Sequence, residues 1–308
     1  MQNQVTNTVM MVRPASFQFN SETAVSNAFQ KKIENLTEEE ILSMAINEFD
    51  AFVKKLLENK IEVLVIQDTK NPQKPDAIFP NNWISMGNDG NIFLFPMCTP
   101  NRRLERSTSI LDKLNEKYKI KEIIDLSDSE HNNLFLEGTG SIIFDHLNKM
   151  AFACISPRTD INLFKTHCTQ IGYEPVYFYS KDKNGFLVYH TNVMLTIGND
   201  FAVICAETIK DLKERKNVIN KLENGGKLII EITENQMNHF AGNMLQLKNK
   251  EGKYFLVMSN SAYQSLDKGQ IEKIEQMTDI LTVDIPTIET IGGGSARCMM
   301  AEIFLESK

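Results

Sequence analysis

The chain has 308 residues, of which 42% are apolar and 24% charged, and its formal net charge is −7. This composition fits a folded protein with a sizeable core and excludes a disordered, collagen-like or coiled-coil chain. The acidic excess, without any block of Lys and Arg, argues against nucleic acid or an anionic membrane as partner, so we expect a small-molecule ligand.

The cysteines and the ends of the chain indicate a reducing compartment. An odd number of cysteines, far apart and without a CxxC pair, predicts neither a disulfide framework nor a thiolate zinc site; they are Cys98, Cys154, Cys168, Cys205 and Cys298. No apolar run approaches the ~20 residues of a membrane-spanning helix, and the polar N-terminus lacks the pattern of a signal peptide. We therefore expect a cytoplasmic protein without membrane contact.

Short strands alternate with helices along the chain. β-Branched and aromatic residues predict strands at 61–67, 91–97, 141–145, 150–155, 176–179, 193–197, 202–206, 228–232, 244–247, 254–258 and 280–285. Apolar periodicity predicts helices at 37–59, 102–118, 161–171, 209–223 and 270–277. Thr37 and Glu40 form a capping box at the start of the first helix, whose predicted buried stripe is Ile41, Met44, Ala45, Phe49, Phe52, Val53 and Leu56. This pattern is typical of an α/β or α+β chain.

The same unit, a hairpin followed by a helix, recurs along the chain. Complete units open at Asn82, Gly140, Asn192 and Asn243, at intervals of 51 to 58 residues, and a further step of similar length reaches Cys298. Too few residues follow Cys298 to complete a unit, but the N-terminal segment 8–12 could complete it.

Two architectures fit this recurrence. Five units closed by the two termini would form a ring, make residues 1–308 a single domain, and gather the first residue of each hairpin around a central pocket. A β-sandwich with inserted helices would also show regular hairpins with Gly and Asn turns. Periodicity alone leaves both open.

Cys298 is the cysteine whose surroundings favour chemistry. It follows the sequence GGGSAR at 292–297, where small residues let a ligand approach the backbone closely. A helix N-terminus and an adjacent arginine would favour the thiolate that a nucleophile requires. The alternative, a buried structural cysteine, fits Cys154 and Cys205, which lie in apolar strands, while Cys98 and Cys168 stay undecided.

His190 and Glu137 are candidate partners of such a nucleophile. His190 follows a predicted strand at 186–189 and directly precedes the third hairpin, so it occupies a pocket position and could act as general acid and base. Glu137 lies between an apolar run and a glycine-rich turn, where a partly buried carboxylate needs a partner. Taken singly, each could be an ordinary surface residue. The other histidines form no HxH or HxxxH pattern, so no metal site is expected.

Two loops carry polar residues suited to ligand contact. One spans 75–83 and holds the only tryptophan, and the other spans 100–105. Arginine at a helix start opposes the helix dipole, so an arginine there often binds a substrate carboxylate; Arg158 has a similar setting. Solvated arginines at helix ends are the plainer interpretation.

Six short motifs in order carry a family resemblance. They are FPNN at 79–82, NRRLE at 101–105, LEGTG at 136–140, PRT at 157–159, HTN at 190–192 and the glycine-rich approach to Cys298. Together they resemble the guanidino-group-modifying, or pentein, superfamily of arginine deiminases, dimethylarginine dimethylaminohydrolases and amidinotransferases. The resemblance spans nearly the whole chain and implies a five-bladed α/β propeller with its site on the central axis.

The resemblance also implies roles for individual residues. Cys298 would be the nucleophile, His190 the general acid and base, and Glu137 its orienting carboxylate. Arg103 and Arg158 match positions that hold the substrate α-carboxylate, and Asp76 matches a further substrate contact. No metal or organic cofactor is implied.

The departures from the family pattern bear on the substrate. Asn81 and Asn82 stand where deiminases and methylarginine hydrolases carry acids that clamp a guanidinium, Asn192 replaces an aspartate, and Gly140 stands where an aspartate is expected. A buried carboxylate without a cationic partner is costly, whereas an amide offers a donor and an acceptor that match a neutral ureido group. The sequence therefore favours L-citrulline over arginine and resembles the citrulline-utilisation hydrolases (citrulline ureidases).

The hypothesis is a cysteine hydrolase that converts citrulline to ornithine, ammonia and carbon dioxide through an S-carbamoyl cysteine. The closest alternative is a deiminase or methylarginine hydrolase that produces citrulline. An amidinotransferase would need an amine acceptor. A non-catalytic pentein, resembling the ribosome anti-association factors, is a further alternative that the combination of Cys298, His190 and Glu137 disfavours. The expected partner is an amino-acid substrate, and a homodimer stays open.

Overall fold

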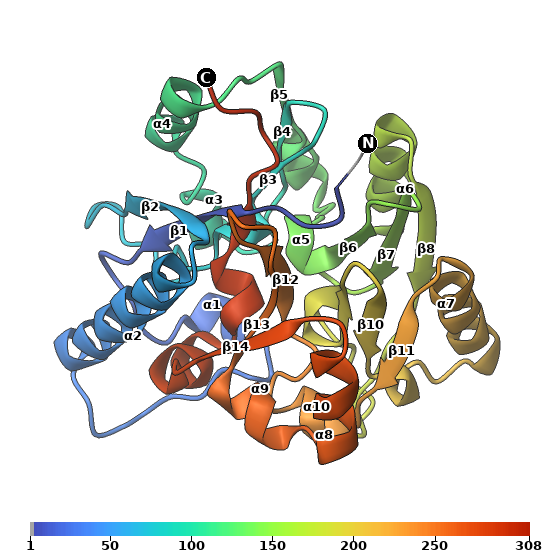
Figure 1. Ribbon diagram of the computed structural model, residues 1–308. Coiled ribbons are helices and arrows are strands. Elements are labelled where there is room, and N and C mark those ends of the chain that lie inside the picture. The colour runs from blue at the N-terminus through green and yellow to red at the C-terminus, as the bar shows by residue number, and fades with distance from the viewer. Residues whose placement is uncertain (1–2) are drawn as a thin grey trace.

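The computed structural model describes residues 3–308 and contains, in this part of the chain, five sheets of three strands each (Figure 1). In every sheet the central strand pairs antiparallel with one neighbour and parallel with the other. In four of the sheets the antiparallel pair is a predicted hairpin, and in all five the parallel strand is reached through a helical crossover. The recurring unit seen in the sequence is therefore one sheet with its helix.

Four sheets are continuous in sequence. They consist of β3 (Ile84–Met86), β4 (Asn91–Leu94) and β5 (Glu122–Asp125); β6 (Ile142–Asp145), β7 (Met150–Cys154) and β8 (Glu174–Phe178); β9 (Leu195–Ile197), β10 (Phe201–Ile204) and β11 (Leu228–Glu231); and β12 (Leu245–Lys248), β13 (Tyr254–Ser259) and β14 (Asp279–Val283).

Both ends of the chain build the fifth sheet. Its central strand is β1 (Thr8–Arg13), which pairs parallel with β2 (Glu62–Gln67) and antiparallel with β15 (Ala301–Glu302). The N-terminal segment thus completes the unit that begins near Cys298, as the recurrence predicted. Five separate sheets also exclude the alternative of a two-sheet sandwich.

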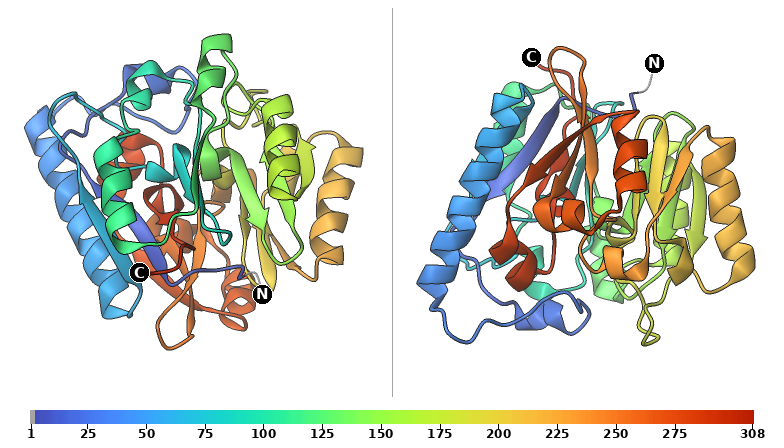
Figure 2. Two further views of the ribbon diagram at one scale, coloured as in Figure 1. Left: turned by 90° about the horizontal axis from the view of Figure 1, so that it is seen from above. Right: turned by 60° about the horizontal axis from the view of Figure 1, so that its bottom comes forward.

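The crossover helices lie on the outside of the sheets (Figure 2). They are α2 (Glu38–Glu58), α4 (Thr108–Lys117), α6 (Ile161–Ile171), α7 (Leu212–Asn224) and α10 (Lys268–Glu275). Shorter helices are α1 (Ser21–Ala24), α3 (Pro100–Arg103), α5 (Gly138–Ser141), α8 (Glu234–Met237) and α9 (Asn260–Ser265). None of the helices within residues 3–308 combines the length and apolar character that a membrane span requires.

Helix α2 shows how local sequence sets these elements. Thr37 accepts from the backbone N–H of Glu40 while the Glu40 side chain accepts from the backbone N–H of Thr37, so the predicted capping box is confirmed. Most of the predicted stripe is buried, but Met44 is 41% exposed because it lies at the edge of the apolar face.

Three sequence predictions differ from the structure. The helix predicted at 102–118 is broken into α3 and α4, with residues 104–107 between them. The segment 186–189 forms only a bridge between Lys181 and Leu187, and Phe186 is largely exposed. Strand β5 was not predicted because its residues are mostly exposed and its two isoleucines stand side by side between two acids, so the alternation of a half-buried strand is absent.

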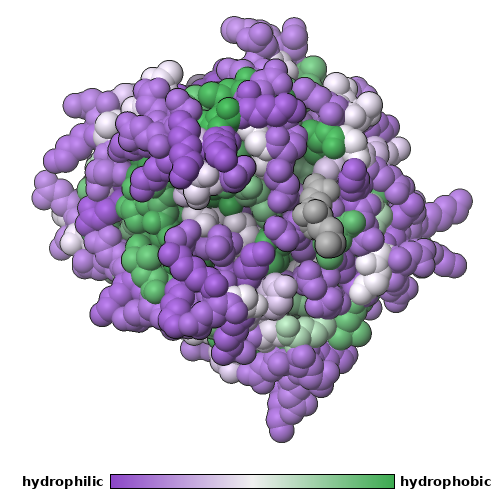
Figure 3. Space-filling view, turned by 45° about the horizontal axis from the view of Figure 1, so that its top comes forward, coloured by the Kyte–Doolittle hydropathy of each residue, from purple (hydrophilic) through white to green (hydrophobic). Residues whose placement is uncertain are grey.

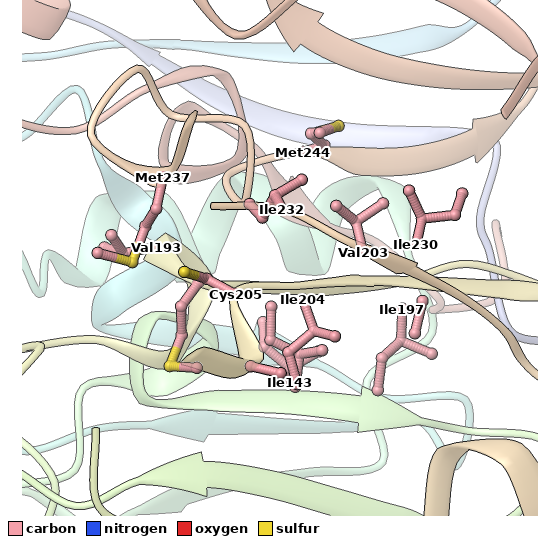
Figure 4. Close-up of a cluster of buried hydrophobic side chains, with 14 of the residues drawn as sticks. Ile143, Val193, Ile197, Val203, Ile204, Cys205, Ile230, Ile232, Met237 and Met244 are labelled. Atoms are coloured by element: carbon pink, nitrogen blue, oxygen red, sulfur yellow. The ribbon is translucent and has the colours of Figure 1, made fainter. Parts of the chain in front are cut away.

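The largest apolar core lies around β9, β10 and their neighbours (Figure 4). Cys154 and Cys205 belong to it, and Cys168, which lies in α6, is buried in another apolar core. Burial raises the pKa of each of these three thiols to about 12, so they stay protonated and unreactive at neutral pH. The prediction that Cys154 and Cys205 fill the core is confirmed.

The first strands of the sheets lie toward one another. β3 contacts β15, and β9 contacts both β6 and β12. The residues that immediately precede these strands are therefore brought close together, and these are the positions that open each unit: Asn82, Gly140, Asn192, Asn243 and Cys298.

Candidate active site

A small cavity brings together side chains from distant parts of the chain, between Thr23 and Cys298. Its volume is about 20 Å³, close to the room that one water molecule needs, so a bound amino acid would require the surrounding side chains to move. Five residues selected from the sequence line it: Asp76, Asn82, Arg158, His190 and Cys298. Thr23 and Asn27, from the segment that includes α1, close it on one side.

Glu137 and His190 form a direct contact in this region. Nε2 of His190 lies 2.7 Å from Oε2 of Glu137, and both side chains are almost completely buried. The other carboxylate oxygen of Glu137 accepts from the backbone N–H of Cys98 at 3.0 Å. An ionised carboxylate only accepts hydrogen bonds, so the imidazole proton lies on Nε2 and leaves Nδ1 free to act as a base.

The charges around this pair keep the carboxylate ionised. Burial alone would raise the pKa of Glu137, but the Arg158 guanidinium 3.5 Å away and the hydrogen bond from His190 lower it to about 2. For His190, burial outweighs the effect of the carboxylate and lowers the pKa to about 4. At neutral pH the pair therefore consists of a carboxylate and a neutral imidazole.

Two amides face the sulfur of Cys298. Asn192 Nδ2 donates to Sγ at 3.4 Å, and Asn243 Nδ2 lies 3.2 Å from the same atom. Asn243 Oδ1 also accepts from the backbone N–H of Arg297 at 3.1 Å. This asparagine thus holds both the thiol and the turn that carries it.

The expected setting of Cys298 needs correction. The residue lies in a short 3₁₀ turn, Ala296–Met299, and not at the start of an apolar helix. The Arg297 guanidinium donates to Glu302 at 2.8 Å and to the Met300 carbonyl at 2.8 Å. Amide donors, instead of a helix dipole and a cation, are the groups that contact the sulfur.

Of the two adjacent arginines, Arg102 lines the cavity and Arg103 does not. Arg103 contacts the Met97 carbonyl and Glu130, outside the cavity, so the structure does not bring it to the position expected from the sequence. Arg102 makes a two-pronged pair with Glu105, at 2.8 and 2.9 Å, and donates to Asn82 Oδ1 at 2.7 Å. Helix α3 is a single turn, so its register decides which arginine points inward.

Asp76 contributes a carboxylate to the cavity wall. Its Oδ2 accepts from Asn20 and Thr23, and Arg102 Nε lies 4.0 Å away. Its Oδ1 is buried and has no hydrogen-bond partner among the described residues. Burial raises the pKa of Asp76 despite the charge of Arg102. An unpaired buried oxygen of this kind is suited to accept a hydrogen bond from a ligand.

Arg158 connects the pair of Glu137 and His190 to the segment that closes the cavity. Its guanidinium donates to the Ser26 hydroxyl at 2.7 Å and to the Thr23 carbonyl at 3.0 Å, and it stacks over the Tyr189 ring. Movement of the closing segment would therefore release donors of Arg158 inside the cavity.

Three asparagines selected from the sequence have different positions. Asn82 lines the cavity, Asn192 contacts the sulfur, and Asn81 lies fully buried with both amide atoms unpaired among the described residues, outside the cavity wall. Gly140 lies against two of the site residues: a Cβ there would be 2.3 Å from Asn82 Nδ2 and 2.9 Å from His190 Nδ1. Glycine at this position lets these two side chains approach each other.

Asn243 and Arg102 are the residues that the sequence-based selection of site residues missed. Asn243 opens one of the recurring units, so the repeat had already placed it beside the central pocket. Arg102 gave no separate signal, because it shares its motif with Arg103. Within residues 3–308 there is no group of three or more His, Cys, Asp or Glu side chains that could hold a metal ion.

Comparison with known proteins identifies the relatives of this chain. The family model described as eukaryotic N,N dimethylarginine dimethylhydrolase matches residues 13–305. No curated protein sequence shows a significant match.

Solved structures of three proteins share the fold. The substrate-bound N-terminal domain of ArgZ, a cyanobacterial arginine dihydrolase, in a cysteine-to-serine variant, superposes with a TM-score of 0.74 at 14% identity, over 97% of this chain and 98% of that domain. Unliganded AgrE gives a TM-score of 0.74 at 14% identity over 98% of this chain. A dimethylarginine dimethylaminohydrolase adduct with S-methyl-L-thiocitrulline gives 0.64 at 14% identity, over 97% of this chain and 99% of that one.

The chain corresponds to part of the longer relatives. It spans 40% of the full-length ArgZ and AgrE chains, and nearly all of the isolated ArgZ domain. These findings assign the chain to the pentein superfamily, as the sequence motifs indicated.

We predict that Asn243→Ala slows the alkylation of Cys298 by iodoacetamide about tenfold, because the thiolate loses a hydrogen-bond donor worth ~1.5 kcal/mol. The rate is measured by mass spectrometry of the Cys298 peptide at fixed pH. The exposed Asn235, replaced by Ala, is the control and should leave the rate unchanged. An unchanged rate in Asn243→Ala would show that its amide does not act on the sulfur.

We also predict that the imidazole of His190 titrates near pH 4, well below the ordinary value of 6.5. Between pH 6.5 and about 4, His190 binds a proton in the unfolded chain but not in the folded chain. The free energy of unfolding therefore falls as the pH drops through this range. NMR titration of the histidines, with His190→Gln to identify the resonance, measures this value. Titration of His190 at pH 6 or above contradicts the prediction.

Proposed function

The chain belongs to the family of eukaryotic N,N dimethylarginine dimethylhydrolases, and on that premise we propose that it hydrolyses the ureido group of L-citrulline. As a family member it is a hydrolase that acts on non-peptide C–N bonds. The finer proposal is that Cys298 is the nucleophile, His190 the general acid and base, and Glu137 the group that orients the imidazole.

The observation that carries the choice of citrulline is the amide environment of the thiol. The side chains that donate to Sγ of Cys298 are Asn192 and Asn243, and neither can neutralise a guanidinium. Two of the three nearby carboxylates already have cationic partners, since Glu105 pairs with Arg102 and Glu137 with Arg158, and the third, Asp76, is left for the substrate α-ammonium group. A neutral ureido group fits such a pocket without leaving a charge unpaired.

The α-carboxylate and α-ammonium groups of an amino-acid substrate fit the other charged side chains of the cavity. Arg158 would exchange its contacts with Ser26 and Thr23 for the substrate α-carboxylate. The unpaired Oδ1 of Asp76 would accept from the α-ammonium group. Arg102, held by Glu105, would keep Asn82 in place and supply a second positive charge.

The proposed reaction has two steps. Nδ1 of His190 takes the thiol proton, Cys298 attacks the ureido carbon, and the C–N bond to the ornithine nitrogen breaks as that nitrogen receives the proton. The S-carbamoyl cysteine then reacts with water, which His190 deprotonates, and the released carbamate gives ammonia and carbon dioxide. The chain needs no metal or organic cofactor for either step.

An arginine-type substrate is the second candidate, and one observation favours it. If all five charged groups near the cavity were ionised, the three acids Asp76, Glu105 and Glu137 would exceed the two cations Arg102 and Arg158 by one charge. A cationic substrate would balance this excess. Burial, however, raises the pKa of Asp76 and raises that of Glu105 to about 7. Both acids therefore hold a proton more readily, and the excess of negative charge is smaller.

Two further features belong to the proposal. The five sheets are arranged as the blades of a five-bladed propeller around this cavity, and residues 1–308 form one catalytic domain. The relatives support the covalent step, since an asparagine-to-serine variant of the ArgZ domain is covalently bound to a reaction intermediate. The expected compartment is the cytoplasm, and a homodimer is compatible with the fold.

Incubation of the purified chain with citrulline, arginine, dimethylarginine and agmatine, with products identified by mass, tests the function. We expect ornithine from citrulline, and a loss of about 10⁴-fold in kcat/KM for Cys298→Ser. Cys205→Ala, a core cysteine variant, is the control and should keep its activity. Citrulline formed from arginine or dimethylarginine would replace the proposal with the second candidate. Full citrulline turnover by Cys298→Ser would refute the nucleophile.

The position of His190 is tested by Gly140→Ala. The added Cβ would displace Asn82 and the imidazole, and we expect kcat/KM to fall at least ~100-fold, as for other small misplacements of a reacting group. Gly269→Ala, in α10, is the matched control, because its added Cβ would make only an ordinary contact, 3.4 Å from Asp267 Oδ1. Its activity should be unchanged and its stability slightly raised. Thermal melting verifies that both variants fold. Normal turnover by a folded Gly140→Ala variant would show that the position of His190 does not matter for the reaction.

A further inference from the structure

A second cavity, of about 420 Å³, lies between the sheet that contains β3 and the sheet that contains β6. It shares no lining residue with the cavity of Cys298. Its volume falls within the range of ~300–1,000 Å³ that is typical of small-molecule pockets. The face near the two chain ends shows a hollow with an apolar floor and a hydrophilic rim (Figure 3).

An ordered group of rings, which we call the aromatic wall, lines one side of this cavity: Phe144, His146, Tyr173 and Phe304. The His146 ring stacks on Phe144 at 5.2 Å and meets Phe304 edge-on at 5.0 Å. Nδ1 of His146 hydrogen-bonds the Tyr173 hydroxyl at 2.8 Å. These contacts fix the rings in place, so a flat ligand would meet a preformed surface.

A second histidine, His167, lines the cavity from helix α6. His167 is buried, and its ring meets Phe93 edge-on at 4.8 Å. Nδ1 of His167 has no hydrogen-bond partner among the described residues. Burial lowers the pKa of His146 and of His167 to about 4, so both imidazoles are neutral at physiological pH.

The charges at this cavity include both signs. The acids are Asp89, on the exposed turn after β3, and Glu302, which Arg297 pairs at 2.8 Å. The cation is Lys149, on the turn after β6. An anionic ligand would face Asp89 and Glu302, and a cationic ligand would face Lys149, so a ligand of either sign meets a like charge.

We propose that this cavity binds an uncharged, planar heteroaromatic molecule of about nucleobase size. Its ring face packs on the aromatic wall, and its polar edge meets His167, whose imidazole lines the cavity. The cavity is separate from that of Cys298, because the two share no lining residue, and the proposal does not rest on the proposed hydrolase reaction.

Adenine is the first probe, because it is flat, uncharged at neutral pH and carries several ring nitrogens. Calorimetry and ligand-detected NMR on the full chain should show one site with a Kd of about 1 mM or tighter. Phe144→Ala should weaken binding at least tenfold. Leu147→Ala, on the turn that follows β6, is exposed and outside the cavity lining; it is the control and should bind normally.

Two further variants separate this site from the active site and from misfolding. Cys298→Ser, or excess citrulline, should leave adenine binding unchanged. Phe144→Leu keeps the apolar volume but removes the ring, and it should lose affinity while melting like the parent chain. The inference is overturned if adenine and benzimidazole both fail to bind, if citrulline displaces them, if Phe144→Ala and Phe144→Leu bind normally, or if benzoate or tetramethylammonium binds more tightly.

Discussion

The pairing of β1 with β15 is the constraint on which the site depends. Val9 lies opposite Glu302 and Met10 opposite Ala301, so two segments nearly a whole chain apart become neighbours. Cys298 comes three residues before β15, in a turn whose backbone Asn243 holds from another sheet. Without this pairing the thiol would have no fixed position relative to His190 and Glu137.

The site also requires that its buried polar groups form hydrogen bonds and ion pairs with one another. Glu137 is completely buried, yet it stays ionised because Arg158, His190 and a backbone N–H surround it. Arg102 and Glu105 form a similar buried pair beside Asn82. Such pairs contribute little net stability after desolvation, but breaking one partner leaves an expensive unpaired charge. They therefore fix geometry more than they stabilise the fold.

Much of this arrangement could be predicted from the sequence, for identifiable reasons. The recurring hairpins consist of short runs rich in apolar, β-branched and aromatic residues joined by Gly or Asn turns, which is why the units opening at Asn82, Gly140, Asn192 and Asn243 were located correctly. Helix α2 was delimited by its capping box. The motifs of the superfamily then pointed to His190, Glu137 and Cys298, which the fold brings to one region.

The features that the sequence predicted wrongly or missed depend on tertiary contacts, which no local sequence pattern encodes. The choice between Arg102 and Arg103 rests on the orientation of the single turn of α3, and Arg297 turns to Glu302 because that acid lies on the following strand. Strand β5 is mostly exposed and forms by pairing with β4, so its own residues give little signal. The second cavity arises from packing between two sheets, which sequence periodicity cannot show.

The shortness of β15 has a consequence for the lifetime of the protein under oxidising conditions. A two-residue strand can fray by local opening, without unfolding of the remaining sheets, and such openings occur at lower free energy than global unfolding. Each opening would release the turn that carries Cys298 from its amide partners and expose the sulfur to peroxide or disulfides. Cys154, Cys168 and Cys205, enclosed in the apolar cores, would be spared. Redox damage would therefore spare these three core cysteines and fall on Cys298 and on the partly buried Cys98.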